Sequence, residues 1–101
     1  MIDEKKLIAR FFRYAEISSE SGSEEEICAC LMNDLAQMGL SPVIDTVGQK
    51  IGSTGGNIYC NVPGKLSGEP LLLSAHVDTV KPGKNVQPLL GDHYITTSTG
   101  W

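Results

Sequence analysis

The chain has 101 residues and a mass of 10.9 kDa, with 41% hydrophobic and 20% charged residues. This length allows one small domain, and the composition is that of an ordinary soluble globular protein. The net charge of -4 is spread along the sequence without a cluster of Lys or Arg, which argues against nucleic acid as a partner. No apolar stretch reaches the roughly 20 residues of a transmembrane helix, and the first residues, MIDEKK, lack a signal peptide's apolar region. We therefore expect no membrane partner and a cytoplasmic location.

The three cysteines, Cys28, Cys30 and Cys60, are an odd number without the spacing of a disulfide framework, which suits a reducing compartment. Cys28 and Cys30 would make half of a metal site, but positions i and i+2 of a helix point to nearly opposite sides. We therefore interpret Cys30 and Cys60 as small buried hydrophobic residues.

Two amphipathic helices are predicted in the first part of the chain. The first carries apolar residues at helical spacing, with Asp3 in position to cap its start. The second is predicted to begin at Ser23, which forms a capping-box pattern with Glu26, and to end at Gly39. The expected apolar face of this second helix consists of Ile27, Cys30, Leu31, Leu35 and Met38.

After Pro42 the pattern changes from helices to strands. Residues 43–47 and 58–62 alternate as two strands, with the turn at residues 52–56 (GSTGG). After a loop, residues 71–75 (LLLSA) form an apolar run that is typical of a strand buried on both faces. The order predicts an α/β fold in which two helices are followed by a mixed sheet. No repeat or linker divides residues 1–101, so we expect a single domain.

His76 and Asp78 stand at the end of this apolar run. Residues i and i+2 of a strand project from the same face, and ligands of open α/β sheets gather beyond the carboxyl ends of the strands. A metal-bound histidine usually donates its second ring N–H to a carboxylate. The pattern therefore predicts a metal ligand and its partner, with an ordinary ion pair at the surface as the alternative reading.

Residues 74–80 (SAHVDTV), followed by PGK at 82–84 and GDHYI at 91–95, resemble the dinuclear-zinc exopeptidases. This family includes peptidase T, glutamate carboxypeptidase, aminoacylase and the desuccinylases of lysine biosynthesis, and the likeness is closest to peptidase T and peptidase T-like proteins. Upstream agreement lies in residues 11–17, 19–22, 35–39 and 55–58. The resemblance spans nearly the whole chain and implies the amino-terminal part of a zinc-exopeptidase-like catalytic domain.

The resemblance also implies roles for single residues. His76 would bind one zinc ion, and Asp78 would be the catalytic carboxylate that orients His76. The complete family site uses two zinc ions and a glutamate base to activate a water that attacks the peptide carbonyl. The implied substrates are short peptides that are cut from the amino end. The resemblance also implies that full-length relatives can form homodimers.

The chain departs from the family pattern after this motif. The family site also needs a bridging aspartate, a glutamate base beside a glutamate ligand, a further acidic ligand and a second histidine. No glutamate follows Glu69, and the only acidic residues beyond it are Asp78 and Asp92. We therefore expect an incomplete domain with at most one partial zinc site, inactive by itself.

Asp92 and His93 are possible substitute ligands, but their position after Gly91 favours a hairpin turn. Three functions stay open for the chain: the first segment of a zinc aminopeptidase, a small non-catalytic module that binds metal or protein, and a non-functional truncated product.

Overall fold

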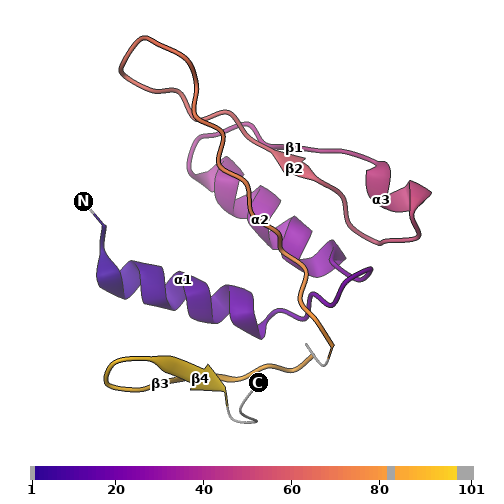
Figure 1. Cartoon of the computed structure of the whole chain (residues 1–101), viewed down its shortest axis with the longest axis vertical. Coiled ribbons are helices and arrows are strands. Elements are labelled where there is room, and N and C mark those ends of the chain that lie inside the picture. Colours follow the sequence, from indigo (N-terminus) through magenta and orange to yellow (C-terminus); the bar gives the residue numbers. More distant parts are fainter. Residues whose placement is uncertain (1, 82–83, 98–101) are drawn as a thin grey trace.

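The computed structural model describes residues 2–81 and 84–97. Its elements in chain order are α1 (Glu4–Glu16), α2 (Glu25–Gln37), β1 (Val43–Ile44), α3 (Val47–Lys50), β2 (Ile58–Tyr59), β3 (Pro88–Leu90) and β4 (Ile95–Thr97). The α/β class is confirmed, although the strands form two separate antiparallel pairs, β1–β2 and β3–β4. The β3–β4 hairpin lies beside α1, and the segment between β2 and β3 runs past α2 (Figure 1).

The first helix begins as the sequence predicts. Asp3 has an extended backbone, and its carboxylate accepts a 3.2 Å hydrogen bond from the Lys6 N–H, which satisfies one of the free donors of the first turn. The apolar stripe of α1 is only partly covered, since Leu7 is 57% and Phe11 53% exposed. In the part of the chain that the structure describes, no helix is long and apolar enough to span a bilayer.

The second helix ends as predicted but begins differently. Gly39 has φ 83°, the Gly39 N–H donates to the Ala36 carbonyl (3.0 Å), and the Leu40 N–H donates to the Leu35 carbonyl (3.2 Å). These bonds form a Schellman motif, which favours glycine at this position. The predicted Ser23 cap is wrong, because Glu24 occupies the cap position and its carboxylate accepts from the Gly22 N–H and the Ser53 hydroxyl.

The small core lies along α2. Ile27 and Cys28 are buried, with 4% and 2% of their surface exposed. The expectation that Cys30 and Cys60 are buried is wrong, since both are half-buried. Cys28 is the buried cysteine because it faces residues 55–56, with its Sγ 3.8 Å from the Gly56 carbonyl oxygen.

The hairpin-like pair is confirmed, since Val43 pairs with Tyr59 and Ile44 with Ile58. The first strand is shorter than predicted, because Val47 begins α3 instead of continuing it. The cause is Asp45, whose Oδ1 accepts the N–H groups of Val47 (3.2 Å) and Asn57 (2.9 Å) and so ends the strand in a turn.

The prediction of a buried strand at residues 71–75 is wrong for this chain. Leu71, Leu72 and Leu73 are 86%, 87% and 85% exposed, and no strand is assigned there. An apolar strand is stable only between neighbours that accept its hydrogen bonds and cover its side chains. Among residues 2–81 and 84–97, no such neighbour pairs with residues 71–75. The next pairing along the chain is the parallel bridge between Thr79 and Glu20.

Candidate metal centre

His76 and Asp78 are in contact. The His76 Nδ1 lies 3.1 Å from Asp78 Oδ1 and 2.9 Å from the Asp78 carbonyl oxygen. The imidazole is 86% exposed, whereas the Asp78 side chain is 40% exposed. A proton on Nδ1 would be donated to Asp78, and Nε2 would then be the unprotonated nitrogen, which is the form in which imidazole binds a metal.

The turn that leads into α2 anchors the end of this motif. The Thr79 N–H donates to the Ser19 carbonyl (2.9 Å), and the Thr79 carbonyl accepts from the Ser21 N–H (3.1 Å). Between them, Glu20 is buried and lies 3.9 Å from the Lys84 ammonium group. The backbone N–H and carbonyl of Thr79 are therefore both bound, which fixes the chain directly after Asp78, while no described residue forms such backbone bonds with residues 71–75.

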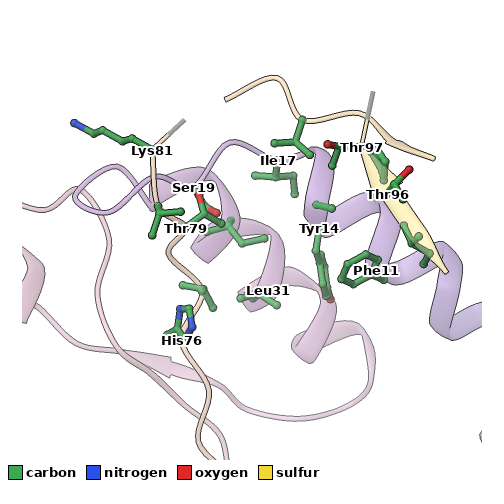
Figure 2. A pocket seen from close by; sticks show the side chains of 17 residues that line it. Phe11, Tyr14, Ile17, Ser19, Leu31, His76, Thr79, Lys81, Thr96 and Thr97 are labelled. Carbon is green, nitrogen blue, oxygen red and sulfur yellow. The ribbon is translucent and has the colours of Figure 1, made fainter. Parts of the chain in front are cut away.

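His76 lies between two cavities. One, of about 600 Å³, is mostly apolar and extends from His76 and Leu31 to Phe11 and Tyr14 of α1, with Thr96 of β4 on its far side (Figure 2). The other, of about 850 Å³, is lined by residues 72–78, α2 and the β1–β2 side of the molecule. The imidazole is therefore reachable from two sides.

Two further acidic side chains, Glu24 and Asp34, line the second cavity. The Ser53 hydroxyl bound to Glu24 lowers the pKa of that carboxyl, and the Gly22 N–H adds to the effect. Asp34 accepts hydrogen bonds from Arg13 and from the Tyr14 hydroxyl. Glu24 therefore connects the start of α2 to the loop that carries Ser53, and Asp34 connects α2 to α1. Sequence patterns do not reveal these contacts, because the partners are distant along the chain.

The described residues contain no group of three His, Cys, Asp or Glu side chains placed to hold a metal ion. A catalytic zinc ion usually takes three protein ligands. His93 is exposed in the turn between β3 and β4, where the Gly91 N–H donates to the Tyr94 carbonyl (2.8 Å). The hairpin reading of Asp92 and His93 is confirmed. Of the predicted site residues, the structure brings His76 and Asp78 into contact.

No family model matches the chain. An uncharacterised protein of Bacillus subtilis, YqjE, is 31% identical over 97 residues, which are 96% of this chain and 26% of that protein. The crystal structure of a tripeptidase from Staphylococcus aureus superposes with a TM-score of 0.90 at 30% identity, over 97% of this chain and 26% of the tripeptidase. The aminopeptidase PepT from Bacillus cereus superposes with a TM-score of 0.84 at 27% identity, over 96% of this chain and 26% of PepT.

The chain thus spans about a quarter of the length of each of these relatives. The likeness covers nearly the whole of this chain. In sequence and in fold, the chain corresponds to the amino-terminal part of a peptidase T-like tripeptidase domain.

Proposed function

We propose that this chain contributes one metal ligand, His76, and its orienting carboxylate, Asp78, to the metal site of a peptidase T-like aminopeptidase that hydrolyses short peptides. The observation that carries the proposal is the His76–Asp78 pair, in which Nδ1 is held by the carboxylate 3.1 Å away and the ring is exposed. The similarity to a tripeptidase and to an aminopeptidase supports the reaction class.

The residues fit one part of a zinc site. His76 would hold the ion through Nε2, and Asp78 would fix the tautomer and orientation of the ring. A bound zinc ion would supply Lewis acidity and lower the pKa of a water ligand. The other ligands and the general base would come from outside the described residues, so the chain alone is expected not to hydrolyse peptides.

A chimera tests the assignment. The matched region of the S. aureus tripeptidase is replaced by this chain, and hydrolysis of an unmodified tripeptide is followed. His76→Ala should abolish hydrolysis, and Asp78→Asn should lower it by about 10 to 100-fold, as loss of a ligand's orienting partner does. His93→Ala is the matched control and should be without effect, because His93 is exposed in the turn between β3 and β4. A folded His76→Ala chimera with undiminished activity would refute the proposed role.

A further inference from the structure

Glu24 differs from the two glutamates that follow it. It is half-buried at the cap position of α2, whereas Glu25 and Glu26 are exposed. One oxygen of its carboxylate accepts the Gly22 N–H, and the other oxygen accepts the Ser53 hydroxyl. Both oxygens are thus engaged in bonds that hold the side chain in one place.

The Glu24 carboxylate stabilises the tight turn before α2. It binds the N–H of Gly22 inside this turn, where φ is 91°. The same turn carries Ser21, whose N–H donates to the Thr79 carbonyl (3.1 Å). The Glu24 side chain is therefore connected, through the turn, to the backbone that directly follows Asp78.

Glu24 also adds charge to the surroundings of the His76–Asp78 pair. Glu24, His76 and Asp78 all line the cavity of about 850 Å³. The Ser53 hydroxyl is the main cause that lowers the pKa of Glu24, whereas the charge of Asp78 acts in the opposite direction and raises this pKa. The two carboxylates are therefore close enough to interact. A second negative charge near a histidine ligand favours a cation at that ligand.

We propose that Glu24 is a positioning residue of the metal site, which fixes the turn that holds the backbone after Asp78 and adds a negative charge that favours a zinc ion at His76. The inference rests on the proposed function, because it concerns the same metal site. Glu24 is not placed as a ligand itself, since the described residues contain no group of three His, Cys, Asp or Glu side chains that could hold a metal ion.

Hydrogen exchange in the unfused chain tests the connection between Glu24 and the motif. In Glu24→Ala, the amides of Ser21 and Thr79 should exchange about tenfold faster than in the control Glu25→Ala, because the turn opens locally. The amides of α1 are the internal reference and should be unchanged. Equal exchange of Ser21 and Thr79 in the two variants would overturn the inference, and so would an equal acceleration of the α1 amides.

The zinc affinity of the chimera with the S. aureus tripeptidase tests the effect on the metal site. It is measured by competition with a chelator of known affinity. Glu24→Gln keeps the size of the side chain and removes its charge, and it should weaken zinc binding about tenfold, as loss of a partner outside the ligand set does. Glu25→Gln removes the same charge from an exposed neighbour, and it should leave the affinity within about twofold because solvent and salt screen that charge.

The variant His76→Ala distinguishes the two ways in which the account can fail. Equal zinc affinities of Glu24→Gln and Glu25→Gln, with zinc lost in His76→Ala, would overturn the role of Glu24 and leave the proposed function standing. A folded His76→Ala chimera that keeps its full zinc content would refute the proposed function itself, and with it the role of Glu24 at the metal site.

Discussion

The Tyr14 hydroxyl donates a 2.5 Å hydrogen bond to Oδ2 of Asp34, and this contact joins α1 to α2. The Arg13 guanidinium donates to the same oxygen. Asp34 is buried, and the pKa of Tyr14 is raised by burial first and by the bond to Asp34 second. Because few apolar side chains are buried between the helices, this polar contact is a main link between them.

Removing the hydroxyl should therefore destabilise the chain. We expect Tyr14→Phe to lower the free energy of unfolding by about 1.5 kcal/mol, since a hydrogen bond to a charged, buried acceptor is lost. Denaturation by urea measures the change. In the control Tyr59→Phe, the lost hydroxyl lies 3.4 Å from Asp45 and belongs to a side chain that is 60% exposed, so the effect should stay within about 0.5 kcal/mol. Equal losses in both variants would contradict the role of Asp34.

Glu24 should make part of the stability depend on pH. Its folded-state pKa lies below the ordinary value of 4.5, mainly because of the Ser53 hydroxyl. The stabilisation is therefore fully present above pH 4.5 and is lost as the pH falls through the lower, folded-state pKa. Ser53→Ala should have a lower free energy of unfolding than the native chain near neutral pH. This difference in the free energy of unfolding should become smaller in acid.

Unfolding by denaturant at a series of pH values from neutral to acid measures this gap. Ser67→Ala, at an exposed loop position, is the control and should show no gap that changes with pH. A Ser53→Ala gap that is constant or grows towards acid would contradict the link between Ser53 and Glu24.

Gly48 should tolerate no side chain. A Cβ at this position would lie 1.7 Å from the Gly55 carbonyl oxygen, which is a backbone atom that cannot turn aside. We expect Gly48→Ala to cost about 2 kcal/mol or more, as overpacking against backbone does. Thermal unfolding gives the measurement, with Gly64→Ala as control, because nothing lies within 4 Å of a Cβ there. A native melting temperature for Gly48→Ala would show that residues 48 and 55 do not approach in this way.

The two predicted helix caps should differ in their contribution to stability. Asp3→Ala should cost about 1 kcal/mol, because it removes the acceptor of the Lys6 N–H. Ser23→Ala should cost less than about 0.5 kcal/mol, because its side chain caps nothing and its own N–H donates to the Glu20 carbonyl regardless of the side chain. Circular dichroism measures the helix content of the two variants, and denaturation by urea measures their free energies of unfolding. A larger loss of stability for Ser23→Ala than for Asp3→Ala would support the predicted capping box and contradict the observed cap.

The parts of the fold that were predicted correctly depend on neighbours in sequence. Asp3 caps a residue three positions on, Gly39 ends its helix through bonds to the preceding turn, and His76 meets Asp78 two residues away. Local spacing is enough to infer such contacts. The same reasoning predicted the β3–β4 turn from Gly91.

The parts that were not predicted depend on distant partners. Glu24 takes the cap position in place of Ser23 because its carboxylate binds Ser53, which lies 29 residues away. The apolar run at residues 71–75 indicates that a strand there would need neighbouring strands and covering side chains. It does not indicate whether the described residues supply these neighbours. For the same reason the sequence did not reveal how exposed the His76 ring is.

The zinc content of the chimera with the S. aureus tripeptidase tests the central claim most directly. After loading with zinc and removal of free metal, the metal bound per chain is measured by mass spectrometry for the unchanged chimera, His76→Ala and His93→Ala. We predict that His76→Ala holds one zinc ion fewer, while His93→Ala keeps the full content. A folded His76→Ala chimera with the same zinc content as the unchanged protein would contradict the assignment of His76 as a metal ligand.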